Sequence, residues 1–116
     1  MILKKLKAVR GAVTCENSTK SIQKEVCFLF SEILKLNRLR EKDIVSIQFT
    51  VTKDITALNP ATALRKNGFA KDLALFCSAE PETENSLPNT VRLLIHYYSR
   101  LKPVYVYLNG AANLRK

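Results

Sequence analysis

Residues 44–52, IVSIQFTVT, carry the clearest strand pattern in the chain. Apolar and polar side chains alternate along it: Val45, Ile47, Phe49 and Val51 against Ser46, Gln48, Thr50 and Thr52. A period of two predicts a β-strand with one apolar and one polar face. The pattern is typical of an internal strand in a sheet that carries helices on one face only.

One helix is expected before this strand in the sequence, and another is expected after it. Over residues 19–38, apolar residues recur at steps of four, three, four and three, which predicts a helix with one buried face: Ile22, Val26, Leu29, Ile33 and Leu36. Further along, Asn59 is a good N-cap and Pro60 suits a first helical position. They predict a short helix from Pro60 to Asn67, closed by Gly68 in the left-handed conformation.

Four further strands are predicted, at residues 5–13, 73–77, 91–98 and 104–108. The strand 73–77 is apolar throughout, which favours a central place in the sheet. Gly11 indicates a bulge or a close backbone approach in the first strand. The segment 81–90, PETENSLPNT, is predicted to be a loop, and Asn109 and Gly110 a turn.

The order of these elements is β-α-β-α-β-β-β. It predicts an α+β fold, with helices packed on one side of a mixed sheet. The chain has 116 residues, which is enough for a single domain over residues 1–116.

The net charge of the chain favours anionic partners but does not distinguish between the kinds of anion. Lys and Arg outnumber Asp and Glu by 19 to 10, for a net charge of +9. An excess of this size favours anionic partners, among them nucleic acid, anionic lipid and small metabolites. A basic surface that is simply solvated fits the charge equally well.

Cysteine and histidine use excludes several classes of site. The three cysteines, Cys15, Cys27 and Cys77, are odd in number and widely spaced, and His96 is the single histidine. We therefore expect no disulfide framework, no metal site and a reducing compartment. The N-terminus lacks the apolar run of a signal peptide, and no apolar stretch is long enough for a membrane span. The prediction is a cytoplasmic protein with no membrane contact.

Two arginines lie among residues that favour burial. Arg10 falls within AVRGAV (residues 8–13) and Arg92 within VRLLI (residues 91–95). Each could face solvent across an amphipathic sheet. Together with Arg65, and with Glu80 and Tyr107 at strand ends, they could instead line a pocket for a small polyanion that carries a hydroxyl. His96 and Cys77 read as packed side chains, so no nucleophile or general base stands out.

Five short motifs, in order along the chain, carry a resemblance to a known family. They are VRGAVT (residues 9–14), NPATALR (59–65), CSAE (77–80), VR (91–92) and VYL (106–108). In these motifs the chain resembles the monofunctional chorismate mutases of the trimeric, pseudo-α/β-barrel class. The resemblance implies a five-stranded mixed sheet with helices on one face. It also implies a homotrimer whose active sites lie between subunits.

The resemblance implies a reaction as well. Chorismate is converted to prephenate by an intramolecular [3,3] rearrangement, a step in the synthesis of phenylalanine and tyrosine. No cofactor, metal or covalent intermediate is implied. The enzyme folds the substrate and stabilises the negative charge that grows on the ether oxygen.

Catalytic roles follow from the same resemblance. Arg92 supplies the cation beside the ether oxygen, and Arg10 binds a substrate carboxylate. Tyr107 donates a hydrogen bond in the same region, and Glu80 accepts one from the ring hydroxyl. Further substrate-binding residues are implied at Arg65, Cys77, Phe76, Asn59, Ala61, Thr62, Leu114 and Arg115. Of these, Arg65 would come from a neighbouring subunit, and Leu114 and Arg115 would form a tail over the pocket.

The chain departs from the family pattern in its short helix. Asn59 stands where an aromatic residue is usual, and Thr62 replaces a usual lysine. We expect these changes to affect substrate affinity more than the type of reaction. Two alternatives stay open: a non-catalytic trimer of the same fold that binds a small anion, and a basic nucleic-acid-binding domain. The second would use tyrosines interleaved with basic residues: Tyr97, Tyr98, Tyr105 and Tyr107.

Overall fold

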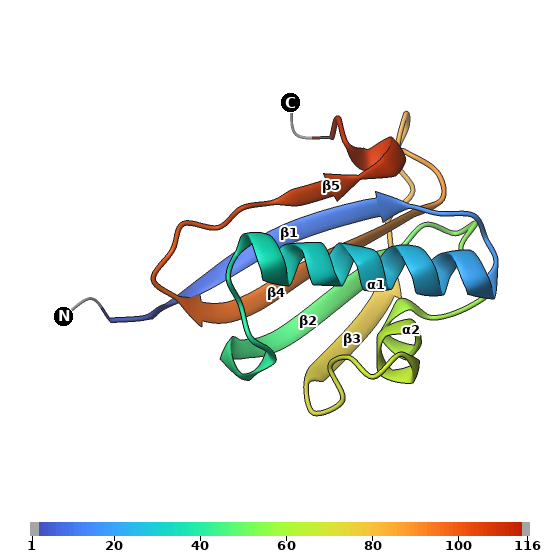
Figure 1. Ribbon diagram of the computed structural model, residues 1–116. Helices are drawn as coiled ribbons and strands as arrows, with labels where there is room; N and C mark the ends of the chain where they lie inside the picture. The colour runs from blue at the N-terminus through green and yellow to red at the C-terminus, as the bar shows by residue number, and fades with distance from the viewer. Residues whose placement is uncertain (1–2, 115–116) are drawn as a thin grey trace.

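Five strands and two helices form the chain, in a computed structural model that describes residues 3–114 (Figure 1). The strands are β1 (Lys5–Thr14), β2 (Ile44–Val51), β3 (Ala74–Ala79), β4 (Thr90–Ser99) and β5 (Val106–Leu108). The helices are α1 (Thr19–Leu36) and α2 (Pro60–Lys66), and 3-10 turns occupy Glu41–Asp43 and Asn109–Ala111. The predicted order of elements is confirmed.

The strands make one mixed sheet in the order β3-β2-β4-β1-β5. The pairs β1/β4 and β2/β4 are antiparallel, while β2/β3 and β1/β5 are parallel. Each parallel pair is joined through a long connection, because parallel strands cannot be linked by a tight turn. The five-stranded mixed sheet of the prediction is confirmed.

Both helices cover one face of the sheet (Figure 1). Ser18 caps α1 by accepting a hydrogen bond from the backbone of Ser21 at 3.1 Å. The buried stripe of α1 contains four of the five predicted positions, together with Phe30: Ile22, Val26, Leu29, Phe30 and Ile33. Leu36, at the end of the helix, is instead 48% exposed. The apolar stripe therefore sets which side of α1 faces the sheet.

Residues alternate between the two faces of the sheet. The helix face carries the buried core: Val9, Val13, Ile47, Phe49, Val91, Leu93, Ile95 and Tyr97. We call the opposite side, which neither α1 nor α2 covers, the open face. By strand register it carries Arg10, Ala12, Thr50, Phe76, Arg92, Leu94, Tyr98 and Tyr107. The alternation places both strand arginines on the same side of the molecule.

Two details of the predicted sheet are wrong. The apolar strand β3 lies at the edge beside β2, and is not central. Its Phe76 is 65% exposed on the open face, so its apolar character does not come from burial on both faces within this chain. In β2 a bulge between Ile44 and Ser46 leaves Val45 exposed, and Ile44 takes the place on the helix face.

The strand β5 starts two residues later than predicted, because the backbone of Val104 bonds to the side chain of Asn37. Its N–H donates to Oδ1 of Asn37 at 2.7 Å, and its carbonyl accepts from Nδ2 of Asn37 at 2.9 Å. Asn37, just after α1, is 3% exposed and also donates to the carbonyl of Ile33. This one side chain ties the end of α1 to the segment that enters β5.

Within residues 3–114, no helix is long and apolar enough to cross a membrane. In the same part of the chain, no three His, Cys, Asp or Glu side chains gather in a way that could hold a metal ion. All three cysteines are free thiols.

Candidate active site

Arg10, Arg92 and Tyr107 line one cavity on the open face. Its volume is about 330 Å³, and Gly11, Leu93 and Leu114 complete the lining. The three polar side chains come from three neighbouring strands, β1, β4 and β5. We call this the arginine cavity.

Strand register explains how these side chains meet. Ala12 of β1 pairs with Arg92 on one side and with Tyr107 on the other. All three project from the open face, and the small Ala12 side chain leaves space between its two larger neighbours. Arg10, two residues earlier on the same face of β1, borders the cavity next to this row. The sequence motif VRGAVT thus supplies both an arginine and the gap beside it.

Arg10 is exposed, and an aromatic ring holds its position. Its guanidinium carbon lies 5.3 Å from the ring centroid of Tyr105, within range of a cation–π interaction. The Tyr105 ring in turn packs edge-on against Tyr107, with 6.5 Å between the ring centroids. The two tyrosines restrict where the Arg10 charge can lie while leaving it open to solvent.

Arg92 is half-buried and forms an ion pair with Glu80. Its Nε lies 3.2 Å from Oε1 of Glu80, with the two side chains 37% and 23% exposed. The contact lacks hydrogen-bond geometry, so the buried Nε has no hydrogen-bond partner among the described residues. A buried N–H donor without a partner is rare in folded proteins and is often found at functional sites. Since Arg92 lines the cavity and makes no hydrogen bond among the described residues, its terminal N–H groups remain for a group that enters.

Glu80 follows directly after β3, and hydrogen bonds to β2 hold both its main chain and its side chain. Its backbone N–H donates to the carbonyl of Val51 at 2.9 Å, which extends the β2/β3 ladder by one residue. Its Oε1 accepts a hydrogen bond from the hydroxyl of Thr50 at 2.5 Å. Glu80 does not line the arginine cavity itself, but reaches its wall through Arg92. Thr50 was not among the predicted site residues, although its place on the polar face of β2 was a usable signal.

The other predicted residues of β3 lie on opposite faces. Phe76 projects from the open face, whereas Cys77 pairs with the buried Phe49 and packs against the core. Burial raises the pKa of the Cys77 thiol above its ordinary value. The thiol is therefore neutral at physiological pH, and its surroundings are those of a packed side chain.

None of the four predicted residues of α2 and its cap lines the arginine cavity of its own chain. Oδ1 of Asn59 accepts from the backbone of Ala61 at 2.8 Å, as predicted for an N-cap. Ala61 is buried, Thr62 is half-buried and Arg65 is exposed in the last turn. Leu114 does line the cavity, while Arg115 lies outside the described residues.

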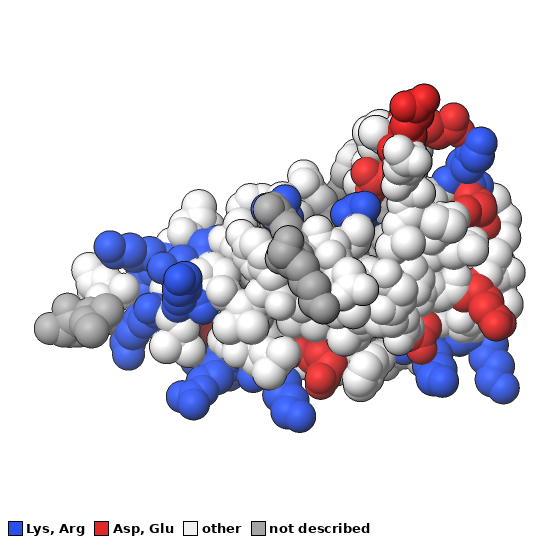
Figure 2. All heavy atoms as spheres, turned by 90° about the horizontal axis from the view of Figure 1, so that it is seen from above, with Lys and Arg blue, Asp and Glu red and all other residues white. Residues whose placement is uncertain are grey.

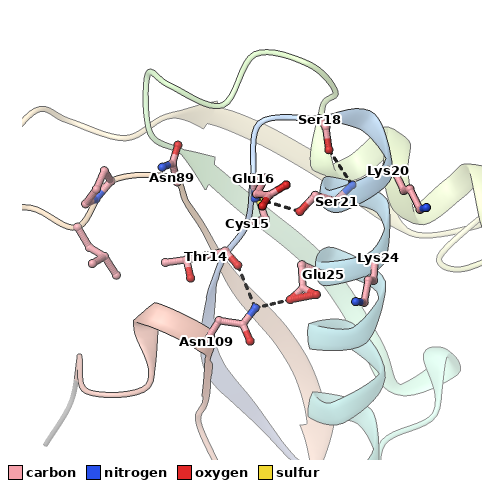
Figure 3. Close-up of a pocket in the computed structure, with 12 residues that line it drawn as sticks. Thr14, Cys15, Glu16, Ser18, Lys20, Ser21, Lys24, Glu25, Asn89 and Asn109 are labelled. Atoms are coloured by element: carbon pink, nitrogen blue, oxygen red, sulfur yellow. Dashed lines mark hydrogen bonds between the residues drawn. The ribbon is translucent and has the colours of Figure 1, made fainter.

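A larger cavity, of about 680 Å³, lies at the start of α1 (Figure 3). It holds none of the predicted site residues, and several of its polar groups bond to one another. Nδ2 of Asn109 donates to the carbonyl of Thr14 at 3.0 Å and also to Glu25. Burial, with help from Glu25 and Asp54, raises the pKa of the Cys15 thiol to about 11. Cys15 therefore does not provide a reactive thiolate in this cavity.

Charged side chains are unevenly spread over the surface. Seen from above, Lys and Arg are densest at one end of the molecule, whereas the acidic groups lie mainly at the other end, together with further Lys and Arg (Figure 2). The net charge of +9 therefore acts as a general attraction for anions, while recognition in the arginine cavity depends on its own side chains.

Comparisons with known proteins agree on one family. The family model described as chorismate mutase type I matches residues 6–116. Chorismate mutase AroH of Thermus thermophilus is 30% identical over 115 residues, covering 95% of this chain and 93% of that protein. Chorismate mutase AroH of Bacillus subtilis is 25% identical over 91 residues, or 78% and 72% of the two chains. The solved chorismate mutase from Clostridium thermocellum superposes with a TM-score of 0.85 at 39% identity, covering 90% of this chain and 96% of that one.

Proposed function

The chain belongs to the chorismate mutase type I family and converts chorismate to prephenate, and we propose that the arginine cavity is where this reaction takes place. The reaction is a step of aromatic amino acid biosynthesis. One observation carries the proposal: Arg10, Arg92 and Tyr107, from three strands, border a single cavity on the open face.

The chemistry fits a site made of fixed charges. In a [3,3] rearrangement one C–O bond breaks and one C–C bond forms within the same molecule. No proton has to move, so no nucleophile or general base is required. The substrate must be held in its folded, reactive conformation, and the negative charge that grows on the ether oxygen must be stabilised.

Arg92 is suited to the role of the cation beside the ether oxygen. It is half-buried, it lines the cavity, and its guanidinium makes no hydrogen bond among the described residues. A donor aimed at charge that develops only in the transition state lowers the barrier, since it binds the transition state more strongly than the substrate.

The other polar groups hold the substrate around this cation. Arg10 would bind a carboxylate, because its guanidinium is exposed at the cavity and steadied by Tyr105. Tyr107 would donate to the same region through its hydroxyl. Glu80 would accept from the ring hydroxyl, with the main chain of Cys77 nearby on β3.

A neighbouring subunit would complete the site. The open face exposes several apolar side chains that a second chain could cover: Leu6, Phe76 and Tyr98 are 57%, 65% and 47% exposed. In a homotrimer with sites between subunits, the neighbour would supply Asn59, Ala61, Thr62 and Arg65 from α2. Leu114 and Arg115 would close over the substrate. The three free cysteines support work in a reducing compartment, the cytoplasm.

The activity is tested by following the loss of chorismate absorbance with purified protein. We expect prephenate to form without added metal or cofactor. Arg92→Ala is expected to lower kcat on the order of a hundred- to a thousandfold, the usual loss for one such donor. Arg92→Lys should recover little, because lysine lacks the planar fork of arginine.

Arg38→Ala is the matched control, because it removes the same charge from an exposed position after α1 that does not line the cavity. It should leave kcat unchanged. A wild-type protein that binds chorismate without turnover would contradict the enzyme and support the non-catalytic trimer instead. Salt-sensitive binding to a random oligonucleotide, again without turnover, would support a nucleic-acid-binding domain.

A further inference from the structure

We propose that Thr50 is a positioning residue for the rearrangement: its hydroxyl holds the Glu80 carboxylate so that Arg92 remains available to the substrate. The inference rests on the proposed function of the arginine cavity. It concerns a residue outside the set that binds or contacts the substrate.

Thr50 lies directly between the two charged groups that it would control. In strand register it pairs with Arg92 of β4 on one side and with Ser78 of β3 on the other. Glu80 follows β3, so its side chain must reach across β2 to approach Arg92 on β4. Two strand spacings amount to about 10 Å, and Thr50 occupies the strand between.

The hydrogen bond from Thr50 engages the same oxygen that approaches Arg92. The Thr50 hydroxyl donates to Oε1 of Glu80 at 2.5 Å, while Nε of Arg92 lies 3.2 Å from that oxygen. In the described part of the chain, Oε2 of Glu80 makes no hydrogen bond. This arrangement leaves Oε2 as the acceptor for a substrate hydroxyl. A hydrogen bond from a hydroxyl to a carboxylate is short and strong compared with one between neutral groups.

Without the hydroxyl, Glu80 would have two poorer choices. Its side chain could turn fully toward Arg92 and form a bidentate pair, which would use the donors that the transition state requires. It could also swing toward solvent, since three rotatable bonds separate the carboxylate from the backbone. Either way the charge pattern of the cavity would change, although the backbone of Glu80 would remain held by Val51.

Two substitutions separate this role from a structural one. Thr50→Val keeps the β-branched shape and strand propensity but loses the hydrogen bond to Glu80, so its melting temperature should fall. Thr50→Ser keeps the hydroxyl but is a poorer strand former, so its melting temperature should also fall slightly. With a structural role, activity would follow the melting temperature, whereas with the positioning role it follows the presence of the hydroxyl.

The expected result is a loss of activity in the variant that lacks the hydroxyl. Thr50→Val should lower kcat/KM on the order of ten- to a hundredfold, the loss typical of a hydrogen bond to a charged group. Most of this loss should appear in kcat, because Arg92 acts mainly in the transition state. Thr50→Ser should stay within about threefold of the wild type, because it keeps the hydroxyl that donates to Glu80. Ser46→Ala, which removes a hydroxyl from the same face of β2, is the control and should change nothing.

Kinetics of wild type, Thr50→Val, Thr50→Ser and Ser46→Ala, each with its melting temperature, decide the question. The inference is overturned if Thr50→Val matches the wild type, or if Thr50→Ser loses as much activity as Thr50→Val. It is also overturned if the loss in Thr50→Val lies wholly in KM. A wild-type protein without turnover would instead reject the proposed function, so the two failures are distinguishable.

Discussion

At Arg10 and Gly11, neighbouring residues of β1 meet opposite requirements on the two faces of the sheet. Arg10 points to the open face and its cavity, whereas Gly11 is buried beneath α1. A Cβ atom on Gly11 would lie 2.8 Å from Cδ1 of Ile33 and 3.1 Å from the carbonyl oxygen of Val106. Of the two interpretations left open for Gly11, the structure supports the close backbone approach. The helix rests on the strand at this point because a side chain is missing.

Gly11→Ala is therefore expected to destabilise the fold. The end of the Ile33 side chain can shift, but the backbone carbonyl of Val106 in β5 cannot move without disturbing the sheet. Overpacking of this kind costs about 1–3 kcal/mol. Urea unfolding should show a lower midpoint with an unchanged slope. An unchanged midpoint would mean that α1 can move away from β1 freely.

Among the elements, β5 depends most on contacts made outside the sheet. It has three residues and only one neighbouring strand, yet it carries Tyr107 into the cavity. The short ladder of β5 is supplemented by two hydrogen bonds between the side chain of Asn37 and the backbone of Val104. The end of α1 thus helps to set the position of a proposed catalytic side chain.

Asn37→Ala should weaken both the fold and the site. It leaves the N–H and the carbonyl of Val104 without partners in a partly buried place, at a cost of about 2 kcal/mol. We expect a lower unfolding midpoint and a higher KM for chorismate, because β5 loses its anchor. Asn67→Ala is the control, since Asn67 ends α2 in the same manner but its side chain bonds only to Ala63 of its own helix. Equal effects from the two variants would contradict the anchoring role.

A second contact between elements joins the end of β2 to the start of β4. The Asp54 carboxylate accepts from the hydroxyl of Thr52 at 2.5 Å and from the backbone N–H of Asn89 at 3.0 and 3.1 Å. The Thr52 hydrogen bond is the main cause that holds the pKa of Asp54 below its ordinary value of 3.8, and the Asn89 bond adds to it. The loop after Glu80 returns to the sheet at this point.

The lowered pKa gives a pH dependence with a definite sign. The folded protein holds the Asp54 proton less tightly than the unfolded chain, so the carboxylate stabilises the fold above the ordinary pKa of 3.8. This contribution is lost as the pH falls through the lower pKa of the folded state. Asp54→Asn should therefore be less stable than the wild type near pH 7, and the difference should shrink as the pH falls below the ordinary pKa of 3.8. Urea midpoints across this range would measure it, and a constant difference would exclude the charge as the cause.

In the whole molecule, the open face combines exposed apolar side chains with the arginines of the cavity. A sheet covered by helices on one side leaves apolar and charged groups together on the other: Leu6, Phe76 and Tyr98 lie on the same face as Arg10 and Arg92. Apolar side chains exposed in one patch favour contact with another chain. The proposed homotrimer would bury this face and bring α2 of one subunit to the cavity of the next.

A mixing experiment tests whether sites form between subunits. Arg65→Ala and Arg92→Ala should each be strongly impaired alone. If the two arginines of one site come from different subunits, a mixed trimer contains one site in which both are intact. Refolding an equal mixture should then restore about a quarter of the wild-type activity, as random assembly of closed trimers requires.

The outcome that contradicts shared sites is equally clear. If both arginines of a site came from the same chain, mixed trimers would show no more activity than the two variants alone. Differently tagged variants would verify that mixed oligomers had formed. A monomer in sedimentation, active without Arg65 of a neighbour, would reject the trimer itself.

The extent of sequence-based prediction differs between the helices and the sheet. The stripe of α1 and the cap of α2 are local patterns, and both appear as predicted. The apolar run of β3 was misread, because an edge strand that exposes an apolar side chain such as Phe76 resembles a central strand in composition. The bulge at Val45 was missed as well, since nothing in an alternating pattern marks the residue that will be left unpaired.

The candidate site divides in the same way. Its arginines were recognisable because charged residues in apolar strands stand out, and the order of the motifs along the chain was enough to indicate the family. That Arg10, Arg92 and Tyr107 share a cavity, and that Thr50 binds Glu80, depended on strand register. The two residues of the last contact are 30 positions apart, and no local signal links them.

The helices and strands, their apolar faces and the family resemblance could all be inferred from the residues alone. These features follow from periodicity, capping and motif order, all of which act over a few residues. The strand order, the bulge in β2 and the Thr50–Glu80 hydrogen bond became clear only once the chain was folded. Strand pairing joins residues far apart in the chain, and the packing of the whole core selects the register of each pair.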